Sequence, residues 1–274
     1  MFRLNSNFLN RLVKKIPILV FSLALVIMST TSAFAYTTEA FDVDVVVAEN
    51  NSYEVSETVK VNFDKQQHGI YVYIPESGIE GIDLPDFKIP NQRDPEIDNV
   101  WVKDWNYEVY SENGNKVFQI GDADETVTGR QTFEFGYRMT IIDDRDTTKD
   151  FMYLDLLPTG WETAIKSTTI HVTMPKVVDS SKIQVYADTY GSNDMVSNVS
   201  WDCDETGQNI TITGKNLAKG QGITIFAELP EGYWQDQLNY DSVLTLIPII
   251  CIVLAAVLLA LWMIFGRDKG IIPT

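Results

Sequence analysis

Cysteine is scarce in this chain of 274 residues, which contains only two cysteines. Cys203 lies in the central part of the sequence, and Cys251 lies within a long apolar run near the C-terminus. We expect that run to span a membrane, so the two thiols cannot pair with each other. The central part of the chain must therefore fold on its apolar core alone, without the disulfides that strengthen many secreted domains.

Histidine is equally scarce, with two residues, and this limits the chemistry that the chain can perform. His68 precedes Gly69 at a turn, and His171 falls on the polar side of an expected strand. Neither has neighbours in the sequence that complete a Ser-His-Asp or Cys-His set, and a zinc site would lack ligands. We therefore predict no catalytic residue, no cofactor and no enzymatic activity.

Basic residues are few, with 21 lysines and arginines against 38 acidic residues and a net charge of −17. Between Tyr36 and Ser242 there are 15 basic and 37 acidic residues, so this segment carries −22. A field of that sign repels nucleic acid and anionic lipid head groups, which argues against a nucleic-acid partner. The same field would attract cations or basic partners, although it is also typical of a soluble surface domain.

The N-terminal segment has the three parts of a secretory signal peptide. Basic residues up to Lys15 precede an apolar run that begins at Ile16, and Ala33-Phe34-Ala35 provides a small-x-small cleavage site. A retained N-terminal anchor is the alternative, but Ser29–Ser32 interrupts the apolar run before it reaches spanning length. We predict that residues 1–35 are a signal peptide.

The C-terminal apolar run, Leu244–Phe265, has 22 residues and no charged side chain. As a helix it would be about 33 Å long, enough to cross a hydrocarbon core of about 30 Å. Arg267 and Lys269 follow the run, so the positive-inside rule places the C-terminus in the cytoplasm. We predict a transmembrane helix over 243–265, a cytoplasmic stub over 266–274, and a single-pass cell-membrane protein whose N-terminal domain is extracytoplasmic.

Apolar and polar residues alternate with a period of two between the apolar ends. Tyr53–Phe63 and Thr132–Ile141 show the clearest alternation, which is typical of strands with one face on a core and one in water. Further strand candidates, separated by turn signals, are Phe41–Ala48, Gly69–Ile74, Val100–Tyr110, Lys116–Ile120, Phe151–Leu157, Thr168–Met174, Lys182–Tyr190, Asn209–Thr213 and Ile223–Leu229. The pattern predicts an all-β fold, an extracytoplasmic β-sandwich over 36–239. One elaborated sandwich is preferred to two subdomains divided near Pro175–Ser181.

Two kinds of side chain are candidates for a binding site. Trp101 and Trp105 share one face of an expected strand and could stack on envelope sugars, although tryptophans in a domain without disulfides also suit the core. Acidic loops contain Asp122, Asp124, Asp143 and Asp144, whose oxygens suit calcium, but neither loop has the spacing of a known calcium loop. We therefore treat calcium as a weak candidate and predict no metal site.

An ordered series of motifs resembles the bacterial YciQ-like predicted membrane proteins, a domain of unknown function. The series begins with the eight residues from His68 to Pro75, His-Gly-Ile-Tyr-Val-Tyr-Ile-Pro, which are similar to a Gly-Ile-Tyr-Arg-x-Ile-Pro signature. The other motifs are Ile120-Gly121-Asp122, Thr128-Gly129, the Phe133–Tyr137 strand, Trp161, Ile170–Pro175, Leu229–Tyr233 and Gly266-Arg267-Asp268. The resemblance covers nearly the whole mature chain and implies this topology and fold, without an established activity.

Two features depart from the family pattern. Val72 stands where the signature has arginine, so an anion-binding role for that position is not expected here. Members of the family usually continue into a longer cytoplasmic portion, whereas this sequence ends at Thr274. The chain is therefore either a short member or the front part of a longer protein.

The leading functional hypothesis is a membrane-anchored extracytoplasmic module that binds an envelope component or a protein partner, with the lipid bilayer as its second partner. An envelope glycan-binding module is the first alternative. A hydrolase that uses carboxylates such as Asp122, Asp124 and Asp143 is the second, and it needs two carboxyls roughly 5–9.5 Å apart in a cleft.

Overall fold

The computed structural model describes residues 36–76, 83–84, 87–88, 95–141, 148–189, 194–237 and 241–265. The expected signal peptide and cytoplasmic stub lie outside these residues. The strands are β1 (Tyr36–Val47), β2 (Ser52–Gln67), β3 (Gly69–Pro75), β4 (Asp83–Leu84), β5 (Phe87–Lys88), β6 (Glu96–Lys103), β7 (Tyr107–Glu112), β8 (Asn115–Gly121), β9 (Val127–Thr140), β10 (Lys149–Leu157), β11 (Ile165–Thr173), β12 (Ile183–Thr189), β13 (Val199–Cys203), β14 (Asn209–Leu217) and β15 (Gln221–Pro230). A short 3₁₀ turn, η1 (Ser180–Lys182), and one α-helix, α2 (Asp241–Phe265), complete the described elements.

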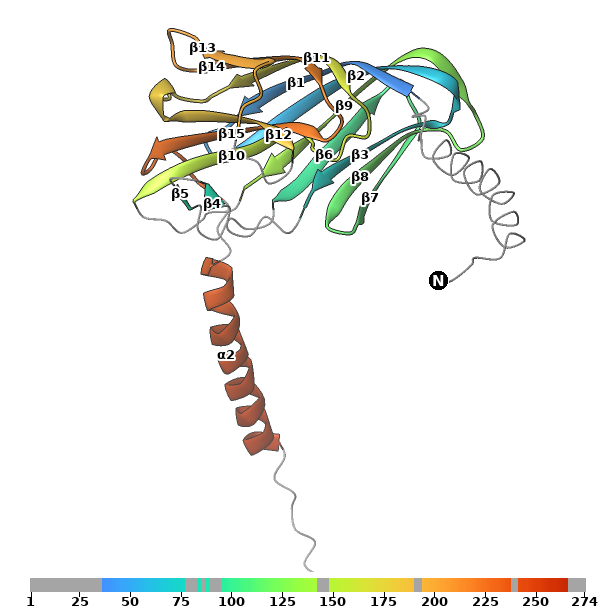
Figure 1. Ribbon diagram of the computed structural model, residues 1–274. Coiled ribbons are helices and arrows are strands. Elements are labelled where there is room, and N and C mark those ends of the chain that lie inside the picture. The colour runs from blue at the N-terminus through green and yellow to red at the C-terminus, as the bar shows by residue number, and fades with distance from the viewer. Residues whose placement is uncertain are drawn as a thin grey trace, which may run out of the picture.

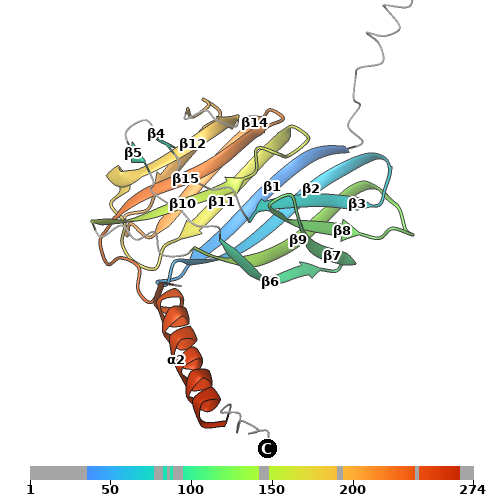
Figure 2. The ribbon, with the colours of Figure 1, turned by 90° about the horizontal axis from the view of Figure 1, so that it is seen from below.

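Two layers of strands form the domain (Figure 1). One layer is a seven-stranded sheet in the order β13-β14-β11-β1-β2-β9-β6, in which β1 and β11 are parallel. The other layer consists of two separate three-stranded sheets, β10-β15-β12 and β3-β8-β7. Seen from below, both lie in front of the seven-stranded sheet, and the arrowheads of β3 and β10 approach each other near its centre (Figure 2).

Period-two alternation builds the core between the layers, because successive side chains of a strand point to opposite faces of its sheet. On β2 the odd-numbered residues from Tyr53 to Phe63 are buried, while its even-numbered residues from Glu54 to Lys60 are partly or fully exposed. Buried residues from the seven-stranded sheet and both three-stranded sheets form one continuous cluster. The strands and the core between them confirm the predicted all-β fold.

One predicted strand was wrong, and one strand of the sandwich was missed together with the two-residue strands β4 and β5. Val100–Tyr110 is divided between β6 and β7, which belong to different sheets, and Asp104 between them has a positive φ of 60°. Asp104 and its neighbours turn the chain out of β6, so the alternation does not continue through this segment. The missed strand, β13, is an edge strand with only one fully buried residue, Val199, and so it lacks a strong apolar alternation.

A close backbone approach explains the glycines at the start of the motif that begins at His68. Gly69 on β3 lies opposite Gly121 on β8, with φ angles of 143° and 138°. A Cβ on either residue would come within 1.9 Å of a backbone carbonyl oxygen of the facing strand. Both the conformation and the space therefore require glycine, and the pair fixes where β3 and β8 meet.

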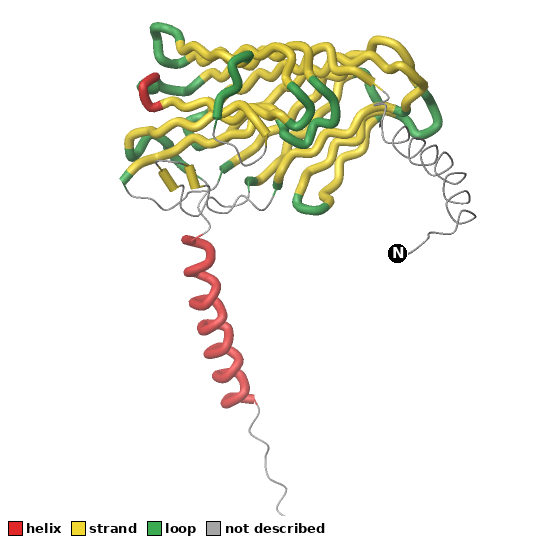
Figure 3. Tube along the Cα trace, viewed as in Figure 1, coloured by secondary structure: helices red, strands yellow, loops and turns green. Residues whose placement is uncertain are grey.

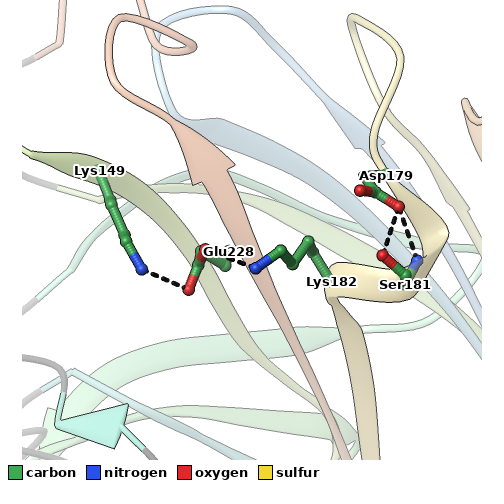
Figure 4. Close-up of polar contacts among 5 residues, drawn as sticks. All are labelled: Lys149, Asp179, Ser181, Lys182 and Glu228. Atoms are coloured by element: carbon green, nitrogen blue, oxygen red, sulfur yellow. Dashed lines mark hydrogen bonds and ion pairs between the residues drawn. The ribbon is translucent and has the colours of Figure 1, made fainter.

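Ion pairs across the β10-β15-β12 sheet connect its three strands near one end (Figure 4). Glu228 on β15 accepts hydrogen bonds from Lys149 on β10, at 2.7 Å, and from Lys182 beside β12, at 3.1 Å. These two bonds hold the pKa of Glu228 below its usual value. Asp179 accepts from the Ser181 backbone N–H and hydroxyl and so caps η1. Such surface pairs contribute at most about 1 kcal/mol each, so they add little to the stability of the sheet.

The α-helix α2 projects away from the strands (Figure 3). Its 25 residues include an 18-residue window, Leu246–Met263, with a mean hydropathy of 2.9 and no burial against the rest of the described chain. An apolar helix with no protein surface to cover it needs another apolar environment, and its length suits a bilayer. By length and composition, α2 is therefore a membrane-spanning helix.

Candidate binding cleft

The residues of the His68–Pro75 motif and of Gly121-Asp122 form one structural unit. The Asp122 backbone N–H donates to the His68 carbonyl at 3.0 Å, next to the Gly69–Gly121 pair. His68 Nδ1 lies 3.0 Å from the carbonyl oxygen of Asp122 and 2.9 Å from that of Glu125. Both partners only accept, so Nδ1 carries the proton in this arrangement. His68 therefore acts as a clamp on the loop after β8.

A cleft of about 980 Å³ lies beside this unit. One wall is β3, all seven of whose residues line the cleft, and the opposite wall contains Asp155 and Leu156 of β10 and the following segment to Glu162. β3 and β10 are the edges of their respective three-stranded sheets. The cleft is therefore the gap where the second layer of the sandwich is interrupted, and its size matches that of ligand sites.

The buried carboxyl of Glu57 lines this cleft from the seven-stranded sheet. The residue is 5% exposed and lies on β2 among the apolar residues that face the core. Tyr137 on β9 donates its hydroxyl to Oε1 at 3.3 Å, whereas Oε2 has no hydrogen-bond partner among the described residues. Burial raises the pKa of Glu57 to about 8, with the Tyr137 hydrogen bond acting in the opposite direction. At neutral pH the Glu57 carboxyl is therefore mainly protonated, and its Oε2 lacks a hydrogen-bond partner among the described residues.

A second acid, Asp155 on β10, faces the same cleft. Its carboxyl accepts from the Thr224 hydroxyl at 2.5 Å and remains accessible to solvent, although protein atoms surround it. This desolvation raises the pKa of Asp155. Burial, followed by the charge of Glu57 and then that of Asp155, raises the pKa of the Tyr137 hydroxyl. The three groups thus lie close together at the cleft, where Glu57 and Tyr137 are buried and Asp155 is accessible to solvent.

The structure divides the acidic calcium candidates. Asp122 accepts from the Asn106 side chain at 2.7 Å and from the Asp124 backbone N–H at 2.8 Å, and these bonds, with that of Asp124 the stronger, lower its pKa. Its carboxylate thus organises its own loop. Asp143 and Asp144 lie outside the described residues. Among the residues that the structure describes, no three His, Cys, Asp or Glu side chains gather in a metal-binding group. Calcium therefore stays a weak candidate.

Trp101 and Trp105 do not share the strand face on which they were expected. Trp101 is on β6, 41% exposed, and its ring lies over Gly136 of β9. Trp105 follows the end of β6, packs 4.6 Å from the Phe133 ring and donates its indole N–H to the Thr132 carbonyl at 3.0 Å. The turn at Asp104 separates the two rings, and a ligand-binding role for them stays a prediction.

Glu57 and Asp155 were not singled out from the sequence, yet a signal for Glu57 was present. Tyr53, Val55, Val59 and Val61 occupy the inward register of β2, and Glu57 interrupts that register with an acid. A charged residue at a core position is costly unless it has a role or a partner. Asp155 gave no comparable signal, because nothing in the residues around it shows that the second layer of the sandwich is interrupted beside β10.

An all-β domain joined to one membrane-spanning helix defines the class of protein to which this chain belongs. The chain belongs to the family described as "Predicted membrane protein (DUF2207) N-terminal domain", whose model matches residues 37–229. The match confirms the resemblance to YciQ-like membrane proteins and covers β2, β3, β8 and β10 of the cleft. None of the curated proteins matches the chain significantly.

Three solved structures illustrate the partial likeness of this chain to known folds. Native leukotriene A4 hydrolase from Saccharomyces cerevisiae is 9% identical with a TM-score of 0.40, over 72% of this chain and 30% of that one. An M1 zinc metallopeptidase from Deinococcus radiodurans is 9% identical with a TM-score of 0.34, over 70% and 42%. A putative protease from Parabacteroides distasonis is 10% identical with a TM-score of 0.38, over 72% and 41%. This chain spans less than half of each, and likeness at this level carries no argument about activity.

The buried acid makes stability depend on pH. Glu57 has a pKa of about 8 in the folded protein and about 4.5 when solvated, so between these values only the folded state holds the proton. The free energy of unfolding therefore falls as pH rises from about 5 to 8. We expect Glu57→Gln to match the wild type near pH 4.5 and to exceed its stability by roughly 4 kcal/mol at pH 8.5.

Urea unfolding of the full chain in detergent, followed by tryptophan fluorescence at each pH, measures this difference. Glu54→Gln, on the solvent face of the same strand, is the matched control and should follow the wild type. A difference between Glu57→Gln and the wild type that does not change with pH would contradict the buried, protonated acid.

Proposed function

We propose that this protein is a membrane-anchored binding module whose domain lies outside the cytoplasm and receives a ligand in the cleft between β3 and β10. One observation carries the proposal, the buried Glu57 carboxyl at the cleft, whose Oε2 lacks a partner among the described residues. A buried acid without a full set of partners destabilises the fold. A ligand that supplies the missing partner explains why such a group lies in the core face of β2.

An extracytoplasmic position rests on the sequence at the two ends of the chain. The signal-like N-terminus and the basic residues after α2 both support an outward position of the strand-rich domain. The net charge of −22 between Tyr36 and Ser242 suits a surface domain.

The orientation can be measured with a single added thiol. Val177 is 67% exposed, so Val177→Cys in a Cys203→Ser, Cys251→Ser background offers one accessible thiol in the strand-rich domain. We expect a membrane-impermeant maleimide to label this thiol on intact cells. Labelling that requires permeabilisation would show that the domain lies inside, and a variant without any cysteine controls for background.

Glycan recognition is a second candidate, and exposed tyrosines in the cleft favour it. Tyr71 and Tyr73 on β3 are 49% and 48% exposed, and their rings stack with centroids 6.5 Å apart. Aromatic rings with polar ends suit the faces of sugars. In this candidate the tyrosines of the family motif take the role that was predicted for the tryptophans.

We propose binding in preference to catalysis. A paired-carboxyl hydrolase needs one ionised and one protonated acid on either side of the bond that breaks. Burial raises the pKa of both Glu57 and Asp155, and the Glu57 side chain is almost fully enclosed. An acid that is almost fully enclosed, as Glu57 is, suits the recognition of a polar or cationic group better.

A variant that fills the cleft tests the binding function. Gly160 lines the cleft, and a Cβ there would meet no atom within 4 Å, so Gly160→Trp should occupy the cleft without strain. We expect this variant to lose at least 90% of the envelope material that the wild-type full chain retains on a column. Val177→Trp places the same side chain on an exposed surface outside the cleft and should retain it. Equal retention by Gly160→Trp and the wild type would contradict a role for the cleft.

A further inference from the structure

β3 is an edge strand without the usual protection. Natural proteins protect sheet edges with charged residues, proline or bulges, because free backbone groups there recruit other strands. The seven residues of β3, Gly-Ile-Tyr-Val-Tyr-Ile-Pro, contain no charged side chain, and proline occurs only at the last position, Pro75. No described strand pairs with the edge of β3 that is opposite β8. This edge lies along the cleft described above.

The register of β3 and β8 shows which backbone groups face the cleft. Asp122 N–H donates to the His68 carbonyl at one end, and Glu76 N–H donates to the Gly114 carbonyl at the other. Hydrogen-bonded and non-hydrogen-bonded residue pairs alternate along an antiparallel pair of strands. The two bonds join the residues next to Gly69–Gly121 and Pro75–Asn115, so these two pairs are non-hydrogen-bonded.

Alternate residues of β3 then share the same orientation. The backbone N–H and C=O groups of Gly69, Tyr71 and Tyr73 point away from β8, toward the open edge. Their spacing of about 6.7 Å is that of successive hydrogen-bonding positions along an added strand. Pro75, which has no N–H, ends the series. The edge therefore offers three consecutive pairing positions to an extended chain.

The charges around the cleft select the side chains of such a chain. Glu57, Asp155 and Glu162 line it together with Asp122, whereas Lys219 is the one lysine among the described lining residues. A strand that pairs with β3 would direct alternate side chains to the same side as Ile70, Val72 and Ile74, which face the core. Glu57 lies on that side. A lysine or arginine on the added strand would therefore meet an acid that otherwise lacks a full set of partners.

We propose that the occupant of the cleft is an extended, basic segment of a partner protein, which adds as a strand to β3 and places a lysine or arginine side chain against Glu57. This inference rests on the proposed binding function and names the ligand class. A second copy of the chain is less suitable, because two domains that each carry −22 repel one another. Strand addition of this kind obtains affinity from the backbone and specificity from alternate side chains.

The test uses the full chain in phosphatidylcholine nanodiscs and a displayed library of random nine-residue peptides, with counter-selection against Gly160→Trp. We expect enriched peptides to contain a lysine or arginine at a fixed position. Replacing that residue by norleucine should weaken binding to the wild type by about tenfold or more. The same replacement should have little effect on binding to Glu57→Gln, while Glu54→Gln should behave as the wild type.

Backbone pairing is tested separately with N-methylated versions of an enriched peptide. Methylation of the alternate amides that face β3 should abolish binding, whereas methylation of the other set should leave it within about threefold. Amide exchange of Gly69, Tyr71 and Tyr73 should slow when the peptide binds. Equal effects of the two methylation patterns would overturn strand addition, and so would enrichment of peptides that lack a basic residue.

The outcomes separate the two proposals. In one outcome, the wild type retains envelope material, Gly160→Trp does not, and no peptide is enriched. That outcome would overturn the peptide inference and leave the cleft as a binding site. No retention and no peptide would overturn both. A dimer seen by sedimentation that Gly160→Trp abolishes, with no peptide enriched, would replace the peptide by a second copy of the chain.

Discussion

The seven-stranded sheet is wider than either sheet that packs on it, and the rest of the domain follows from this mismatch. A strand face made of apolar residues must be covered, and here two three-stranded sheets cover it side by side. Each sheet has an edge strand where the two approach, β3 on one side and β10 on the other. The gap between them leaves one part of the core face open as a cleft.

The placement of Glu57 is informative because of this gap. An acid in the closed core would be strongly destabilising. At the opening of the cleft, a bound ligand can supply the hydrogen-bond partner that the buried carboxyl lacks. The close approach of Gly69 to Gly121 and the hydrogen bonds of His68 fix the position of the first residues of β3 against the end of β8. In the proposed binding function, affinity depends on the backbone groups of β3 and on an acid that the fold holds in place.

The sequence predicted the parts of the fold that depend on local periodicity. Alternation in Tyr53–Phe63 and Thr132–Ile141 located β2 and β9, and the uncharged run after Asp241 located α2. It did not predict the division at Asp104, where a single left-handed residue redirects the chain. The sequence also did not predict the cleft. Glu57 and Asp155 are 98 positions apart, and they line one cleft only because the two three-stranded sheets leave a gap over β2.

The carboxyl of Glu57 itself provides the most direct test of this account. Carbon-13 NMR of glutamate carboxyls in the full chain, assigned by the signal missing from Glu57→Gln, follows the ionisation of this group. The account predicts a midpoint near pH 8. A midpoint near pH 4.5 would show that Glu57 is well solvated, and it would contradict the claim that the cleft holds a buried acid in need of a partner.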